Sequence, residues 1–158
     1  MIRLLVLIFV ALLGACSAPA PFNASEVPKL DYGHGVELRD TEGKVHRIEE
    51  FRGRVTLLFF GFTRCPDVCP TMLLRLKKVR DAVGPLAPNV QVVLLSVDPE
   101  RDTPDILRAY VKNFDPSFIA LRPEPERLEQ TLKAFRAIAI RVPTADGSDY
   151  TVDHSATI

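Results

Sequence analysis

The most informative segment of this 158-residue sequence reads Phe60-Gly61-Phe62-Thr63-Arg64-Cys65-Pro66-Asp67-Val68-Cys69-Pro70. Residues 55–60 form a continuous apolar and β-branched run, which predicts a strand buried on both faces of a sheet. The residues after the segment place apolar side chains at helical spacing, namely Met72, Leu73, Leu76 and Val79. The segment is therefore predicted to join a strand to a helix through a loop that holds two cysteines.

The two cysteines of this loop each precede a proline. A following proline disfavours helical backbone, so neither Cys65 nor Cys69 is expected inside a regular helix. Residues 66–68 are then predicted to form a turn that brings the two thiols close together. Pro70 suits the first position of a helix, which places Cys69 at the helix N-terminus, where the amide dipoles favour a thiolate. Both sulfurs are therefore expected to be available for reaction or for metal binding.

Three uses of such a thiol pair are open: a structural disulfide, a redox couple and a soft-metal site. A disulfide that closes so short a loop would add little stability, which favours redox or metal use. A closed zinc site needs four protein ligands, and the two loop cysteines with the three histidines of the chain do not supply a convincing set. Copper is better matched, because thiolates suit Cu(I) and two sulfurs plus one imidazole suit both oxidation states.

Strand and helix patterns alternate along the rest of the chain. Strands are expected at 36–39 and 44–48, which form a hairpin, and at 90–97, 118–121, 137–142 and 150–152. Helices are expected from Pro104 to about 114, with Thr103 as the N-cap, and over 126–136. This alternation predicts one α/β domain with a mixed central sheet flanked by helices and an N-terminal hairpin.

The N-terminus differs from the rest of the chain. Arg3 is followed by ten apolar residues, 4–13, which are too few to cross a bilayer as a helix and predict a secretory signal. Leu13-Gly14-Ala15-Cys16 resembles the lipobox of bacterial lipoproteins, and an ordinary signal peptidase site is the alternative. We therefore expect a signal peptide over 1–15, a tether over 16–29 that is lipidated at Cys16, and a domain over 30–158.

The overall composition excludes some function classes. The chain has 20 basic and 20 acidic residues, so it lacks the positive excess of a general nucleic-acid binder, and we expect no nucleic-acid partner. Hydrophobic residues make up 47% of the sequence, which is enough for a packed core and excludes a disordered chain.

Three motifs occur in the order that is typical of one known family. They are the segment quoted above, then Ser96-Val97-Asp98-Pro99-Glu100-Arg101-Asp102-Thr103-Pro104, and then Val152-Asp153-His154-Ser155. From about residue 38 to residue 158 the sequence resembles the Sco/SenC family of thioredoxin-like copper proteins. The resemblance implies a thioredoxin-like fold, and it implies that Cys65, Cys69 and His154 bind one copper ion as Cu(I) or Cu(II).

The resemblance also implies a function, because proteins of this family assist assembly of the dinuclear copper centre of cytochrome c oxidase. The expected activity is that of a copper chaperone. Its expected partners are the copper-bearing subunit of the oxidase and a copper donor protein. The expected location is the extracytoplasmic, periplasmic face of the cell membrane, reached through the lipid anchor. Family members usually continue past the histidine with a strand, a turn and a helix, so the terminal strand and helix are expected to be missing here.

Two enzymatic alternatives stay open. One is a thiol–disulfide oxidoreductase that uses Cys65 and Cys69 as a reversible disulfide and reduces the copper-ligand cysteines of the oxidase subunit. The other is a peroxiredoxin-like peroxidase, which is disfavoured because no threonine lies three residues before Cys65; Thr63 is two before. His154 separates the copper site from the redox couple, since a redox couple needs only the two thiols.

Two acidic residues near the ligands are given supporting roles. Asp153 either orients the neighbouring His154 or is simply solvated, and Asp67 is predicted chiefly to set the turn between the cysteines. His34 and His46 match no motif, are expected to face solvent, and are assigned no role.

A charged loop follows the strand predicted at 90–97. It contains Asp98, Arg101 and Asp102, and it lies where ligand sites of α/β proteins gather. Either a cap and a local ion pair order this loop beside the cysteines, or the loop contacts a partner.

Overall fold

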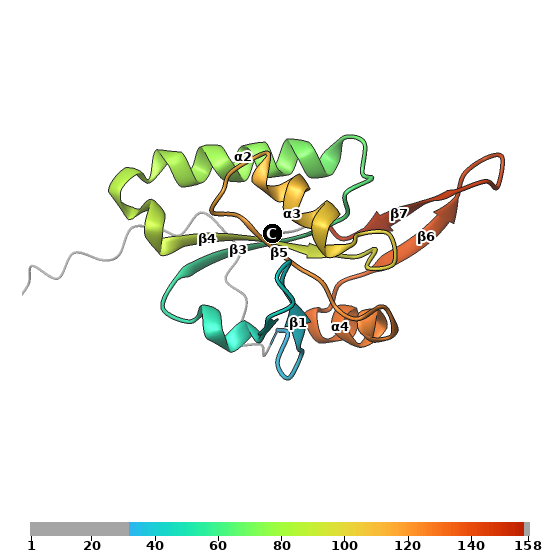
Figure 1. Ribbon diagram of the computed structural model, residues 1–158, viewed down its shortest axis with the longest axis horizontal. Coiled ribbons are helices and arrows are strands. Elements are labelled where there is room, and N and C mark those ends of the chain that lie inside the picture. The colour runs from blue at the N-terminus through green and yellow to red at the C-terminus, as the bar shows by residue number, and fades with distance from the viewer. Residues whose placement is uncertain (1–31, 157–158) are drawn as a thin grey trace, which may run out of the picture. The chain divides into compact units, whose positions relative to one another are not determined.

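The computed structural model describes residues 32–156. Its central sheet has three parallel strands in the order β3-β4-β5 (Figure 1): β3 is Val55–Gly61, β4 is Val90–Ser96 and β5 is Ile119–Leu121. Phe59 of β3 pairs in the register with Leu94 of β4, and both side chains are fully buried. The buried strands predicted at 55–60 and 90–97 are thus confirmed. Their side chains are apolar on both sides, as expected of strands in a sheet that is covered on both faces.

Helices lie on both faces of the sheet (Figure 1). α2, Val68–Ala82, and α3, Pro104–Lys112, lie on one face, and α4, Leu128–Phe135, lies on the other. α3 begins at its predicted cap, because Oγ1 of Thr103 accepts a hydrogen bond from the backbone N–H of Ile106. Within residues 32–156, three short 3-10 segments accompany these helices: η1, Ile48–Phe51; η2, Gly84–Asn89; and η3, Pro125–Arg127.

Two hairpins supply most of the antiparallel pairing among residues 32–156, and one antiparallel bridge joins Arg39 to Arg122. β1, Leu38–Arg39, pairs with β2, Val45–His46, around a turn in which Gly43 has a φ of 82°. β6, Ala139–Pro143, pairs with β7, Tyr150–His154. In Figure 1 this second hairpin extends beyond the end of the central sheet, next to the start of α2. The hairpin therefore brings the end of β7 to the edge where the cysteine loop lies.

One boundary differs from the prediction in a way that concerns the cysteines. α2 begins at Val68, so Cys69 lies in the first turn of the helix and Pro70 is the third helical residue. Proline is tolerated there because the first N–H groups of a helix have no acceptor within the helix. The prediction that neither thiol lies inside a helix is therefore wrong for Cys69, whereas Cys65 does lie in the loop.

The predicted signal peptide, the lipidation site Cys16 and the tether all lie outside the described residues. Between residues 32 and 156, no helix is both long enough and apolar enough to span a membrane.

Candidate metal centre

Three segments that are distant in the sequence meet at one end of the sheet. Cys65 lies in the loop after β3, Cys69 in the first turn of α2, and His154 at the end of β7. Each offers one donor atom, and these atoms all lie within 4.8 Å of one another. Sγ of Cys69 is 3.7 Å from Nε2 of His154, and the backbone N–H of Cys69 donates to Sγ of Cys65 at 3.4 Å. The fold thus brings together the three residues that the motifs singled out.

The imidazole of His154 is oriented by its immediate surroundings. Its Nδ1 lies 2.9 Å from the backbone oxygen of Ser155. A carbonyl oxygen only accepts, so Nδ1 carries the proton and Nε2 presents its lone pair to the thiols. The ring also stands edge-on to Phe59 and Phe62, with centroid distances of 6.2 and 5.8 Å. A donor nitrogen is therefore directed at the two sulfurs in the metal-free protein.

The two thiols have different environments. Both are free, but Cys69 is completely buried whereas Cys65 is partly exposed. Burial raises the pKa of the Cys69 thiol to about 12, and its contact with Cys65 acts in the same direction. The prediction that the helix N-terminus favours a thiolate at Cys69 is therefore wrong for the metal-free protein, because burial deprives the charged sulfur of solvation. A metal that binds this sulfur displaces its proton.

The loop before the cysteines is held by a buried carboxylate. Oδ1 of Asp102 accepts hydrogen bonds from the backbone N–H of Thr63 at 3.1 Å and from its hydroxyl at 2.6 Å. Oδ2 of Asp102 accepts a third from the hydroxyl of Ser96 at 2.6 Å. Asp102 lies in the loop after β4, and this loop also contains the predicted local ion pair, between Arg101 and Asp98. The loop after β4 therefore holds the backbone that leads to Cys65.

The acidic residues predicted to support the ligands act differently from one another. Asp153 is exposed, and Nδ1 of His154 bonds to the carbonyl of Ser155 instead, so of the two alternatives for Asp153 the solvated one holds and the orienting one does not. A backbone carbonyl supplies this contact, which a sequence motif does not reveal. Asp67 is the N-cap residue of α2, and its carboxylate accepts from the hydroxyl of Thr71 at 3.4 Å. Asp67 therefore belongs to the helix start, in keeping with its predicted role in the turn.

The two remaining histidines lie away from the thiols. His34 is 70% exposed and contacts Glu49 at 2.8 Å. His46 is only 14% exposed, because Asp40 at 2.8 Å and Glu50 at 3.2 Å enclose its two ring nitrogens. The prediction that His46 faces solvent is therefore wrong: the turn of the first hairpin and η1 converge on it.

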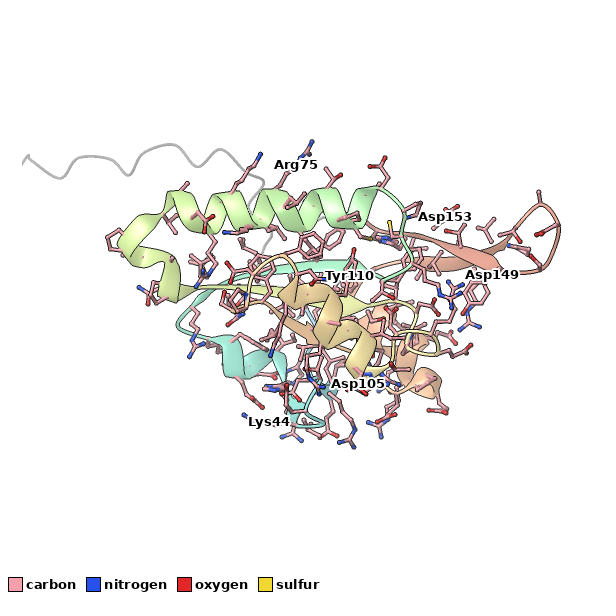
Figure 2. All side chains as sticks on the ribbon, turned by 45° about the horizontal axis from the view of Figure 1, so that its top comes forward. Lys44, Arg75, Asp105, Tyr110, Asp149 and Asp153 are labelled. Carbon is pink, nitrogen blue, oxygen red and sulfur yellow. The ribbon has the colours of Figure 1, made fainter. Side chains whose placement is uncertain are left out.

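Two features of the site gave no signal in the sequence analysis. Gly61, the last residue of β3, lies directly against the sulfur of Cys69. Tyr110 of α3 has a buried hydroxyl with no hydrogen-bond partner among residues 32–156. Burial raises its pKa, as does the negative charge that Cys69 and Cys65 can carry. Figure 2 shows Tyr110 in the interior between α3 and α2. Nothing in the helical pattern distinguishes it from an ordinary core residue.

The donor set can hold a soft metal. Two thiolates and one imidazole are ligands that copper accepts in both of its common oxidation states. Three donors do not complete a closed structural zinc site, which takes four. Within the described part of the chain, Cys65, Cys69 and His154 form the one group of three or more such side chains that could bind a metal ion.

Fold and site together define a thioredoxin-like α/β protein with a dithiol–imidazole centre. More specifically, the chain belongs to the SCO1/SenC family, whose family model matches residues 25–158. The resemblance found in the three motifs is thereby confirmed.

Individual relatives agree with this assignment. A SCO2-like protein of Rickettsia prowazekii is 35% identical over 136 residues, covering 85% of this chain and 66% of the relative. A structure of Bradyrhizobium japonicum ScoI with copper bound has a TM-score of 0.73 at 42% identity and covers 79% of each chain. A structure of Arabidopsis thaliana ScoI with copper bound has a TM-score of 0.69 at 38% identity, covering 76% of this chain and 74% of that one. The chain spans 61% to 66% of the length of the rickettsial relatives it matches.

Proposed function

We propose that this protein is a membrane-anchored, extracytoplasmic copper chaperone that carries one copper ion on Cys65, Cys69 and His154. It delivers this copper to the dinuclear copper centre of cytochrome c oxidase. The observation that carries the proposal is the convergence of two thiols and one imidazole within 4.8 Å. The copper-bound structures of two relatives support copper over other soft metals. Copper is therefore the cargo of this site.

The difference in burial between the two thiols suits transfer of a cargo. Cys69 is fully buried in the first turn of α2, whereas Cys65 is partly exposed in the loop. An incoming ligand of the acceptor reaches the copper from the side of Cys65. We therefore expect Cys65 to be displaced before Cys69. The exchange replaces one ligand at a time and changes no oxidation state.

Anaerobic transfer from the Cu(I)-loaded full chain to the copper-bearing oxidase subunit tests delivery. We expect copper to appear in the acceptor, and we expect Cys65→Ser and Cys69→Ser proteins to deliver none. His34→Ala is the control, because His34 is 70% exposed and lies outside the site. A loaded wild-type protein that transfers no copper to the acceptor would overturn the delivery step.

A second candidate is a thiol–disulfide reductase that acts on the cysteines of the same oxidase subunit. The observation that favours it is that Cys65 and Cys69 are both free thiols within one 4.8 Å cluster. In this reaction the two thiols become a disulfide, while a disulfide of the acceptor becomes two thiols. His154→Ala separates the candidates, because reductase activity needs no imidazole ligand. Full reduction of the acceptor by the His154→Ala protein, together with absent copper transfer by wild type, would favour the reductase.

We propose that Cys16 anchors the protein to the membrane through a covalent lipid. The support is its position directly after a ten-residue apolar run and two small residues. Labelling of cells with a radioactive fatty acid tests this. The wild-type protein should carry the label, and Cys16→Ser should lose it. A labelled Cys16→Ser protein would show that the lipobox interpretation is wrong.

A further inference from the structure

A cluster of hydrogen-bonded side chains ties the strand that carries His154 to the loop after β4. Arg101 of this loop donates from Nη1 to the backbone oxygen of Tyr150 and to Oδ1 of Asp149, each at 2.8 Å. Nε of Arg101 pairs with the carboxylate of Asp98. The hydroxyl of Tyr150 donates to the other oxygen of Asp98 at 2.8 Å. The first residue of β7 is therefore held through both its backbone and its side chain.

The central ion pair of this cluster is buried. The side chain of Asp98 has no exposed surface, and that of Arg101 is 13% exposed. Cζ of Arg101 also lies 3.6 Å from the centroid of the Tyr150 ring, so the guanidinium stacks on the ring that it holds. Removing one partner of a buried ion pair leaves an uncompensated charge, so loss of either Arg101 or Asp98 is costly.

The order imposed at Tyr150 extends along β7 to His154. Alternate residues of a strand share one face, so Tyr150, Val152 and His154 point to the same side. Val152 is 5% exposed and belongs to the hydrophobic core. In Figure 2 the labelled Asp153 lies near the first turn of α2, while the labelled Asp149 lies further out on the hairpin. The contacts of Tyr150 and Val152 thus fix the position of His154 at the end of β7.

The same loop also holds the thiol side of the site. Asp102, the residue after Arg101, accepts two hydrogen bonds from Thr63, which lies two residues before Cys65. Adjacent residues of one loop therefore hold the cysteine loop and the histidine strand.

We propose that Arg101 is a positioning residue: by fixing Tyr150 at the start of β7, it sets the place of His154 relative to Cys65 and Cys69. This proposal rests on the proposed function, because it takes His154 as a copper ligand. Cu(II) favours nitrogen and oxygen ligands in addition to sulfur, whereas two thiolates alone can hold Cu(I). Arg101 therefore acts chiefly on the affinity for Cu(II).

Copper titrations of the full chain test this with a matched control. Arg101→Gln should weaken Cu(II) binding about 10- to 100-fold, the effect typical of residues that orient metal ligands, and should weaken Cu(I) binding much less. Arg141→Gln is the control. Arg141 also stacks on the Tyr150 ring, at 4.9 Å, but its side chain is 44% exposed and pairs with Glu100 at the surface. The Arg141→Gln protein should bind Cu(I) and Cu(II) with wild-type affinity.

A double substitution separates positioning from general destabilisation. In a His154→Ala background, Arg101→Gln should lower Cu(II) affinity no further, because the ligand that it positions is absent. The nitrogen coupling in the Cu(II) electron paramagnetic resonance spectrum should weaken in Arg101→Gln. An equal loss of Cu(II) affinity in both backgrounds, or an unchanged spectrum and affinity in Arg101→Gln, would overturn the proposal.

If Arg101→Gln does not fold, Tyr150→Phe removes only the hydroxyl and should give a smaller loss of Cu(II) affinity. Wild-type Cu(II) affinity in Tyr150→Phe would then overturn the proposal.

A measurement without metal distinguishes failure of this proposal from failure of the proposed function. In the metal-free wild-type protein, nuclear Overhauser contacts should connect the imidazole of His154 with the ring of Phe62, whose centroid lies 5.8 Å away. Arg101→Gln should weaken these contacts, and unchanged contacts would count against positioning. If His154→Ala leaves the Cu(II) affinity unaltered, the assignment of His154 as a ligand fails. The nuclear Overhauser contacts in the metal-free protein still show whether Arg101 positions the imidazole.

Discussion

Gly61 leaves no room for a side chain beside Cys69. A Cβ atom at Gly61 would lie 3.0 Å from the sulfur of Cys69, 3.0 Å from Cδ1 of Leu94 and 2.9 Å from Cε1 of Phe59. Gly61 ends β3 and Cys69 lies in the first turn of α2, so their contact fixes how closely the helix approaches the sheet. That approach places the buried sulfur next to His154.

We expect Gly61→Ala to lower the free energy of unfolding by about 1–3 kcal/mol, because the added methyl group overpacks a filled region. Copper binding should weaken as well, since the sulfur of Cys69 is displaced. Urea unfolding and copper competition measure the two effects. The same substitution in a Cys69→Ala protein should cost less stability, because one of the crowded atoms is gone. Wild-type stability and affinity in Gly61→Ala would contradict the importance of this contact.

The substitution of tyrosine by phenylalanine is expected to change the free energy of unfolding in opposite directions at two positions. Tyr110→Phe removes a buried hydroxyl that has no partner within residues 32–156 and should raise the free energy of unfolding by about 1 kcal/mol. Tyr150→Phe removes the hydroxyl that donates to buried Asp98 and should lower it by about 1–3 kcal/mol. Thermal or urea unfolding decides between them. Destabilisation of similar size in both variants would mean that Tyr110 does have a partner in solution.

The buried carboxylate of Asp102 should give the stability a defined pH dependence. Burial raises its pKa, and hydrogen bonds from Ser96 and Thr63 oppose this only in part. The folded-state pKa therefore lies above the unfolded value, so the folded protein binds more protons in the window between the two. The stability that Asp102 contributes is fully present below the unfolded pKa, about 4, and is lost as the pH rises through the folded pKa.

Asp102→Asn removes that dependence. The difference in unfolding free energy between wild type and Asp102→Asn should therefore shrink as the pH rises from about 4 towards neutrality. Urea unfolding at a series of pH values measures it. A difference that stays constant or grows over this range would contradict the sign of the shift.

The central strands and most helices could be predicted because their signals are local. β4 is buried without interruption over residues 92–96, and α3 has a cap, a first-turn proline and an acidic first turn within three consecutive residues. The cysteine pair could also be identified locally, since each thiol precedes a proline. His154 is 85 positions from Cys69, and no local pattern connects the two residues. Only the resemblance between motifs linked them before the fold was known.

The remaining features depend on contacts that a sequence does not encode locally. The carbonyl of Ser155 orients His154, and every residue has a carbonyl, so Asp153 was the more visible candidate. The pKa of Cys69 follows from complete burial, which depends on how α2 lies on the sheet. His46 is enclosed only because the first hairpin folds back on η1. Each error arose where tertiary packing outweighed a local tendency.

Copper binding to single-residue variants of the full chain tests the central claim most directly. Stoichiometry and affinity are measured for Cu(I) and Cu(II) in wild type, Cys65→Ser, Cys69→Ser and His154→Ala, with the exposed His34→Ala as control. We predict one copper per wild-type and His34→Ala chain, and none with either serine variant. We also predict that His154→Ala weakens Cu(II) more than Cu(I). Unchanged copper content in both serine variants, or equal losses of the two ions in His154→Ala, would contradict a site made of these three residues.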